Sequence, residues 1–364
     1  MVHFAILGCG RIAGNHLQAI QEVPGAKLAA VCDLIHERAD GYSREFGVPA
    51  YTDYHRMLLK EPIDVVCVLT PSGMHPIHAM DIMQRYGKHI VVEKPLALRL
   101  ADIDAMREVA WMASKKIFPV YQHRYNKAVQ LVRDAIQTGA MGTVALATVR
   151  VRWCRPQTYY DRDPWRGTWS LDGGALTNQG IHYLDLLLYL VGEVEQVSAV
   201  TATQLVNAEV EDTAVATLRF VGGAVGVVEV TTAARPHDFE ASISVLTEKG
   251  TAVLGGIACN ELWTWAPAPE ACAANSETFP NVYGLGHTPF IRDVVREILE
   301  GMPHPISLEE GTRAIRLLSA IYRSAEDGVS VFLKDHPASR LLGRHNPGLS
   351  ALYLTPPQPE AAQD

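Results

Sequence analysis

A glycine-rich segment near the start of the chain has a spacing that is suited to binding a phosphate. Residues 8–14 read GCGRIAG and follow an apolar run, which fits the pattern G-x-G-x-x-G/A with Ala13 in the last position. Glycine lets the backbone turn tightly and approach a pyrophosphate, and a helix that begins there offers N–H donors to it. An ordinary glycine-rich turn is the alternative. As a dinucleotide site, the segment would use Gly8, Gly10, Arg11 and Ile12.

An acidic residue at the end of the next apolar run supports the dinucleotide interpretation. Asp33 lies about 20 residues beyond the glycines and follows the run at 28–32. A carboxylate in that place accepts a hydrogen bond from a ribose 2′-hydroxyl and repels a 2′-phosphate. We therefore predict NAD as the cofactor, while Arg38 keeps NADP open as the alternative.

Polar residues also follow two later apolar runs. Ligands of open α/β sheets bind at the carboxyl ends of the strands, so we expect these residues at the cofactor. Lys94 stands out because the apolar run before it would hold a cation in a partly desolvated place; a solvated lysine leaving a strand is the alternative. The residues are Thr70, Ser72 and His75 after the run at 65–69, and Glu93 and Lys94 after the run at 89–92.

A third polar group lies on a segment that is otherwise apolar. Asn178, His182 and Asp185 stand at i, i+4 and i+7, hence on one face of a helix. A polar stripe on a buried helix costs stability unless it is paired or used. The imidazole of His182 could take up a proton near neutral pH, with a satisfied core histidine as the alternative.

Two kinds of periodicity divide the chain. Up to about residue 120, short apolar runs alternate with amphipathic stretches, which is typical of βαβ units and a doubly wound parallel sheet. Later runs are separated by turn signals at hairpin spacing, which indicates a mostly antiparallel sheet. We predict α/β plus α+β: a Rossmann domain at 1–122, a domain with a large open sheet at 123–335 and an irregular tail at 336–364. The expected strands are 3–7, 28–32, 65–69, 89–92 and 117–120, then 144–153, 196–203, 213–220, 224–232 and 241–246; the expected helices are 13–21, 36–46, 76–86, 101–114, 127–138, 174–189, 289–300 and 308–327.

Composition excludes several classes of protein. The 364 residues carry a formal net charge of −8, so the basic surface that nucleic-acid binding requires is missing overall. Six cysteines occur without a C-x-x-C pair, which favours reduced thiols in the cytoplasm, and no Cys/His spacing suits a metal. No apolar window approaches the length of a membrane span, so we expect no membrane partner.

Together these motifs resemble the Gfo/Idh/MocA oxidoreductases over essentially the whole chain to about residue 335. The resemblance rests on GCGRIAG, on the EKP at 93–95 and on the GGALTNQGIHYLD helix at 173–185. Within the family, segments at 155–160, 165–169, 210–213 and 283–287 are similar to the WlbA-type branch, which oxidises sugar nucleotides at C3. Many relatives have Asp where this chain has Asn178, but that branch has Asn as well.

The resemblance implies hydride transfer from a secondary hydroxyl of a sugar to NAD, most closely C3 of a UDP-N-acetylglucosaminuronate. Lys94 would polarise the hydroxyl and His182 would be the general base, with Tyr160 as the next candidate. Asn178, Arg155, Tyr159 and Arg166 would bind the substrate. A free sugar, an inositol or an antibiotic-pathway sugar is the first alternative substrate, and a non-catalytic dinucleotide-binding sensor is the second alternative.

The predicted second sheet has two apolar faces and too few helices to cover both. Runs such as 224–230 would leave one face open in a single chain. We therefore expect a homo-oligomer, a dimer or tetramer that contains a two-fold axis.

Overall fold

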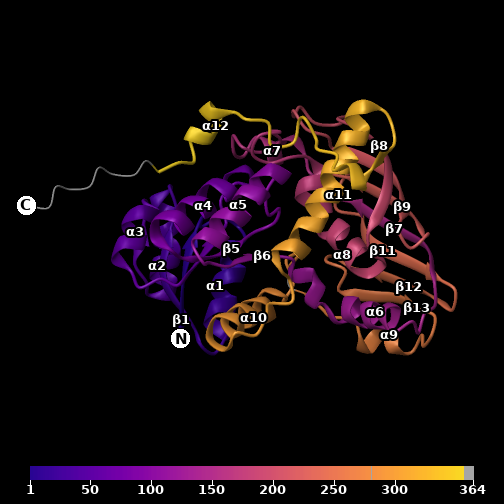
Figure 1. Ribbon diagram of the computed structural model, residues 1–364, viewed down its shortest axis with the longest axis horizontal. Coiled ribbons are helices and arrows are strands. Elements are labelled where there is room, and N and C mark those ends of the chain that lie inside the picture. Colours follow the sequence, from indigo (N-terminus) through magenta and orange to yellow (C-terminus); the bar gives the residue numbers. More distant parts are fainter. Residues whose placement is uncertain (280, 356–364) are drawn as a thin grey trace, which may run out of the picture.

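Two sheets lie side by side, each with its own helices (Figure 1). The computed structural model describes residues 1–279 and 281–355. The first sheet has six strands in the order β3-β2-β1-β4-β5-β6, and the second has eight in the order β13-β12-β11-β7-β10-β9-β8-β14. The predicted fold class, a Rossmann unit followed by a large and mostly antiparallel sheet, is confirmed.

All strands of the first sheet run parallel. Its order reverses between β1 and β4, which creates the crevice in which ligands of such sheets bind. The predicted strands and helices are all present, but β3 and α3 were not predicted, because a two-residue edge strand gives no periodic pattern. The elements are β1 (Val2–Leu7), α1 (Ala13–Glu22), β2 (Ala26–Cys32), α2 (His36–Phe46), β3 (Ala50–Tyr51), α3 (Tyr54–Lys60), β4 (Val65–Val68), α4 (His75–Tyr86), β5 (His89–Val92), α5 (Leu100–Met112) and β6 (Ile117–Pro119).

The second sheet is antiparallel except where β7 pairs with β10. Beyond the strands expected from the sequence it gains β12 and β13 at one edge and the short β14 at the other. Its elements are α6 (Lys127–Gln137), β7 (Val144–Arg152), α7 (Gln157–Tyr160), α8 (Ile181–Val191), β8 (Val194–Ala202), β9 (Thr213–Phe220), β10 (Val225–Thr231), β11 (Glu240–Thr247), β12 (Gly250–Gly255), β13 (Glu261–Trp265), α9 (Ala271–Ala274), α11 (Leu308–Asp327) and β14 (Val331–Phe332).

Helices α8 and α11 cover one face of this sheet. Nine of the eleven residues of α8 are buried, as its sequence IHYLDLLLYLV requires. The later helix α10 (His287–Glu300) instead packs against α1, so the chain returns to the first unit after building the second (Figure 1). The domain boundaries at 122 and 335 stay a prediction.

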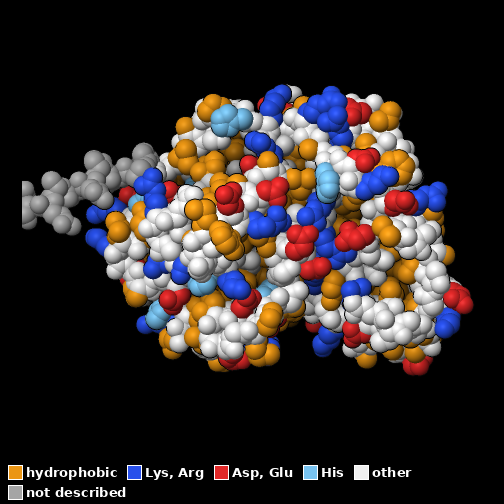
Figure 2. Space-filling view, in the orientation of Figure 1, with side chains coloured by type: hydrophobic (Ala, Val, Ile, Leu, Met, Phe, Trp, Pro, Cys, Tyr) orange, Lys and Arg blue, Asp and Glu red, His pale blue; other side chains and the backbone are white. Residues whose placement is uncertain are grey.

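Three features of the described residues bear on the charge, the hydropathy and the cysteine content of the sequence. On the face drawn in Figure 2, basic and acidic side chains are interspersed and form no continuous basic stripe. Among the helices of the described residues, none is long and apolar enough to cross a bilayer. All six cysteines carry free thiols.

Candidate active site

One cavity of about 880 Å³ collects all the residues to which the sequence assigned a catalytic or binding role, except Tyr160, the second candidate for the base. It lies over the carboxyl ends of the first sheet's strands and is closed on the other side by segments of the second unit. The predicted residues that line it are Gly8, Gly10, Arg11, Ile12, Asp33, Thr70, Ser72, His75, Glu93, Lys94, Arg155, Tyr159, Arg166, Asn178 and His182.

The glycine-rich loop between β1 and α1 has the geometry that a pyrophosphate requires. Gly8 has φ +101°, and a Cβ there would lie 2.7 Å from the carbonyl oxygen of Leu69, so only glycine fits. A Cβ on Gly10 would meet nothing within 4 Å, because that position faces open space in the cavity. The loop leads into the N-terminus of α1, which favours an anion. These residues fit the diphosphate of NAD.

Asp33 sits at the tip of β2, at the rim of the same cavity. Its carboxylate accepts hydrogen bonds from the backbone N–H groups of Cys9 (2.7 Å) and Ile35 (2.8 Å), which fixes its direction. An ionised carboxylate has room for further donors, such as a ribose hydroxyl. Arg38, the residue that kept NADP open, lies 3.8 Å from the carboxylate of Asp163, which also lines the cavity.

His75 joins the two loops that follow β4 and β5. Its ring nitrogens lie 2.9 Å from the carbonyl oxygen of Thr70 and 2.8 Å from that of Pro95. Burial lowers the pKa of His75. Although it lines the cavity, His75 is therefore chiefly a positioning residue, which lies between the loop that contains Thr70 and the loop that carries Lys94.

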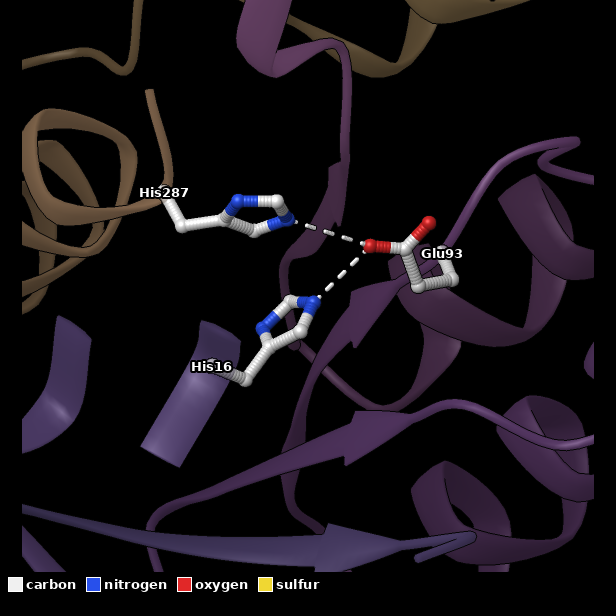
Figure 3. A group of neighbouring side chains, drawn as sticks. All are labelled: His16, Glu93 and His287. Carbon is white, nitrogen blue, oxygen red and sulfur yellow. Dashed lines mark hydrogen bonds and ion pairs between the residues drawn. The ribbon is translucent and has the colours of Figure 1, made fainter. Parts of the chain in front are cut away.

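Glu93 is held by two buried histidines that come from distant parts of the chain (Figure 3). Its Oε1 lies 2.9 Å from Nε2 of His16 on α1 and 3.5 Å from Nε2 of His287 on α10, and its Oε2 accepts the N–H of Lys94. Burial alone would raise the pKa of Glu93, but the two histidines outweigh it and hold the pKa well below its ordinary value. The cluster thus connects α1, which follows the glycine-rich loop, and α10 to the loop that carries Lys94.

Lys94 reaches across to the second unit. Its Nζ donates to the backbone carbonyl of Asn178 at 2.9 Å, and burial lowers the pKa of its ammonium, opposed by the Glu93 and Asp172 carboxylates. The side-chain amide of Asn178 donates to Asp172, which leaves its oxygen as an acceptor. Burial raises the pKa of Asp172 to about 6. Asp172 was not predicted.

His182 lies one turn beyond Asn178, where a π-helical turn (Leu176–Gly180) leads into α8. Its ring stacks on His123, with centroids 4.3 Å apart. Burial, helped by His123 and Lys94, holds the pKa of His182 well below its ordinary value, so the ring is neutral and can accept a proton.

Asp185 on α8 and Tyr160 on α7 are bound to structural partners outside the cavity. Asp185 forms a buried, two-pronged ion pair with Arg124, at 2.6 and 2.8 Å, so the third member of the predicted stripe is paired. The hydroxyl of Tyr160 lies 3.1 Å from that of Thr232, and Tyr160 does not line the cavity. This placement argues against Tyr160 as an alternative base.

A basic and aromatic group forms the cavity wall contributed by residues 153–166. The hydroxyl of Tyr159 accepts from Arg166 at 2.7 Å, and the guanidinium of Arg155 lies over the ring of Trp153. Each arginine has one carboxylate partner, Asp238 for Arg155 and Asp163 for Arg166. Within the described residues, Nη2 of both arginines has no hydrogen-bond acceptor, so each can donate hydrogen bonds to an anion.

Sequence reasoning missed His123, which lines the cavity beside His182. Both of its ring nitrogens are buried without a partner among the described residues, and burial lowers the pKa of His123 to about 3. His123 follows β6 at its carboxyl end. That is the same signal that identified Lys94, and it would have found His123 too.

Comparison with known proteins gives matches over both units. Residues 2–121 match the family described as "Oxidoreductase family, NAD-binding Rossmann fold", and residues 129–253 match "GFO/IDH/MocA C-terminal domain". Among curated proteins, myo-inositol 2-dehydrogenase of Thermotoga maritima is 26% identical over 342 residues, which cover 92% of this chain and 99% of the relative.

Solved structures give closer matches. The WlbA dehydrogenase of Bordetella pertussis, in complex with NADH and UDP-GlcNAcA, is 39% identical, with a TM-score of 0.86, over 91% of this chain and 97% of that one. The WlbA dehydrogenase of Chromobacterium violaceum, with the same two ligands, is 37% identical, with a TM-score of 0.85, over 91% and 95%.

Proposed function

Because the chain belongs to the Gfo/Idh/MocA family of NAD-dependent oxidoreductases, we propose that it oxidises C3 of a UDP-N-acetylglucosaminuronate-type sugar nucleotide. The chain is an NAD-dependent dehydrogenase of sugars or polyols. The observation that carries the narrower proposal is the pair of arginines that share one cavity with Lys94 and His182.

The arginines favour an anionic substrate over a neutral one. A guanidinium recognises a carboxylate or a phosphate through paired N–H donors, and Arg155 and Arg166 each retain a donor group for this purpose. A uronate and a diphosphate would both use such donors. Inositol or a free neutral sugar, the alternative substrates, has no anionic group to accept from these remaining donors. Two WlbA dehydrogenases with UDP-GlcNAcA bound are among the similar solved structures, which further supports the proposal.

The proton of the oxidised hydroxyl is handled by this chain's own residues. When bound, NAD accepts the hydride from the sugar carbon. Lys94, fixed by its bond to the carbonyl of Asn178, keeps N–H groups that can donate to the hydroxyl and orient it. His182 is neutral and can take the hydroxyl proton as hydride leaves. Asn178, its amide turned by Asp172, offers an oxygen to a further sugar hydroxyl.

Turnover with defined substrates tests the proposal. The enzyme is incubated with NAD and UDP-N-acetylglucosaminuronate, myo-inositol or glucose, while the absorbance of reduced nicotinamide is followed, with His182→Asn as the matched control. We expect NADH from the sugar nucleotide alone. Formation of NADH from a neutral polyol but not from the nucleotide would overturn the substrate class. NADH from none of the three would also contradict the proposal and would point to a different sugar.

We also propose that the protein is a homo-oligomer. The face of the second sheet opposite α8 and α11 carries exposed apolar side chains on β8, β9, β10 and β11: Val200 (72% exposed), Val215 (45%), Val225 (47%) and Leu246 (38%). An open apolar face of this kind is normally covered by a partner. Sedimentation at micromolar concentration should give a dimer or tetramer, and a monomer would contradict the proposal.

A further inference from the structure

The last described part of the chain returns to the first unit and becomes a wall of the cavity. After β14 the chain runs to the short helix α12 (Pro347–Ala351), which lies beside the N-terminal unit in Figure 1. Residues 352–355, here called the C-terminal wall, follow α12. Leu352, Tyr353 and Thr355 line the same cavity as the glycine-rich loop. The two matching family regions end at residues 121 and 253, well before this segment.

The path to the C-terminal wall is anchored at several points. Leu342 is buried, and the backbone N–H of Gly343 donates to the carbonyl of Trp169 at 2.8 Å. Gly343 packs so closely that a Cβ there would lie 2.5 Å from the side chain of Arg99. Asn346 then caps α12 by accepting from the N–H of Leu349. This segment is therefore built into the surface of the protein.

Two buried histidines of the first unit receive the C-terminal wall. Nε2 of His78 on α4 lies 3.2 Å from the carbonyl oxygen of Tyr353, and Nε2 of His55 on α3 lies 3.0 Å from that of Thr355. On the opposite side, Nδ1 of His78 meets the hydroxyl of Thr70, a cavity residue, at 3.1 Å. The C-terminal wall is thus linked through one imidazole to the loop after β4.

The bonding pattern of His78 is that of a neutral imidazole. Nε2 donates to the carbonyl of the wall and Nδ1 accepts from a hydroxyl, Thr70 for His78 and Tyr86 for His55. Burial lowers the pKa of His78 to about 4, so its ring keeps this pattern at neutral pH. Without the C-terminal wall, two buried N–H donors would lose the acceptors that they have in the described chain, which is costly.

The C-terminal wall is bound by the first unit, and its Tyr353 also lies near Asp163, Arg38 and Arg166. Its histidine partners are on α3 and α4, which flank β4, whereas Lys94 follows β5 and His182 comes from the second unit. Tyr54 on α3 lies against both histidines, with ring centroids 4.0 Å from His55 and 5.6 Å from His78. Tyr54 lines the cavity together with Leu34 and Ile35, which directly follow Asp33. This is where the adenosine of a dinucleotide bound at Asp33 would lie.

We propose that the C-terminal wall is a cofactor-binding segment, with Tyr353 and Leu352 packing against the adenosine half of NAD. In this role it raises the affinity for the cofactor and slows its dissociation, without taking part in hydride or proton transfer. The inference rests on NAD binding alone and not on which sugar is oxidised. Its failure and that of the proposed substrate are therefore distinguishable.

Two truncated chains test the role of the C-terminal wall. A chain that ends at Gly343 keeps the anchors at Leu342 and Gly343 but lacks the wall, while a chain that ends at Thr355 keeps it and serves as the control. NADH binding is measured by fluorescence titration and its release by stopped-flow dilution, both without sugar. We expect a Kd about tenfold higher for the shorter chain, mostly through faster release, because the surface that Leu352 and Tyr353 would present to the cofactor is lost.

A side-chain variant makes the test independent of folding of the truncated chain. Leu352→Ala with Tyr353→Ala removes the lining side chains and leaves the carbonyls that His55 and His78 bind. We expect this variant to raise the Kd for NADH about threefold, with an unchanged unfolding midpoint in the absence of cofactor. A Kd within the error of the control for this variant, or for a folded shorter chain, would overturn the proposal.

Discussion

The two ends of the cavity are built from different parts of the chain. The nucleotide end consists mainly of backbone: the turn at Gly8, the open space at Gly10 and two N–H groups that direct Asp33. The sugar end consists of side chains from distant segments, among them Lys94, His182 and the arginines at 155 and 166. Apart from the C-terminal wall, local sequence therefore specifies the first end, while the second exists only after the two units have packed together.

The largest effect should come from breaking the sugar end alone. We expect His182→Asn and Lys94→Ala each to lower turnover by about 10²–10⁴, because proton transfer by a positioned side chain contributes on that order. The Kd for NADH should stay within about twofold, since neither side chain belongs to the glycine-rich loop. If the two act as one unit, the double variant will be little worse than the poorer single one. Turnover by His182→Asn near that of the wild type would show that His182 is not the base.

The nucleotide end can be broken in two separable ways. Gly10→Ala should raise the Kd for NADH about a hundredfold without changing stability, because its methyl group enters the open space where the pyrophosphate would bind. Gly8→Ala should weaken binding and also cost about 2 kcal/mol of stability, because φ is positive and the Cβ would meet the carbonyl of Leu69. Binding titrations and thermal unfolding of both variants without cofactor check this. Equal stability of the two would contradict the backbone argument.

The same contrast explains what could be predicted from the sequence. The strands of the first unit and the residues after them follow from periodicity, and so does the placing of Asp33 and Lys94 at one edge. The cluster of His16, Glu93 and His287 could not be predicted, because its members are 77 or more residues apart and no pattern in the sequence relates the two histidines to Glu93. Asp172 was missed for the same reason: only packing shows that it turns the amide of Asn178.

Buried neutral histidines should make the sugar end a source of acid lability. Burial lowers the pKa of His123 to about 3, whereas an unfolded histidine titrates near 6.5. Below pH 6.5 the unfolded chain binds a proton at His123 and the folded chain does not. The contribution of His123 to the free energy of unfolding is therefore full above that pH and is lost as the pH falls. Between pH 6.5 and 5 this amounts to about 2 kcal/mol for one such residue. The free energy of unfolding, measured with denaturant at both pH values, should therefore fall by about 2 kcal/mol less for His123→Phe than for the wild type. An equal fall in both proteins would mean that His123 becomes protonated in the folded protein.

The smallest effect is expected on the choice between NAD and NADP, which we attribute to the carboxylate of Asp33 at the nucleotide end. Asp33 is held by the N–H groups of Cys9 and Ile35, while Leu34 beside it is 45% exposed and lines the cavity. Asp33→Ser with Leu34→Arg removes the charge that repels a 2′-phosphate and adds one that attracts it, so the ratio of NADP to NAD affinity should rise about tenfold or more. Asp33→Asn is the control without the added arginine, because it removes the charge and keeps one of the two oxygens that accept from Cys9 and Ile35. Since the other N–H loses its acceptor, unfolding of this variant without cofactor is compared with that of the wild type. Titration with both cofactors measures the ratio, and a wild type that binds NAD and NADP equally well would show that Asp33 does not select. Arg38 makes that outcome possible, because a 2′-phosphate could draw its guanidinium away from Asp163.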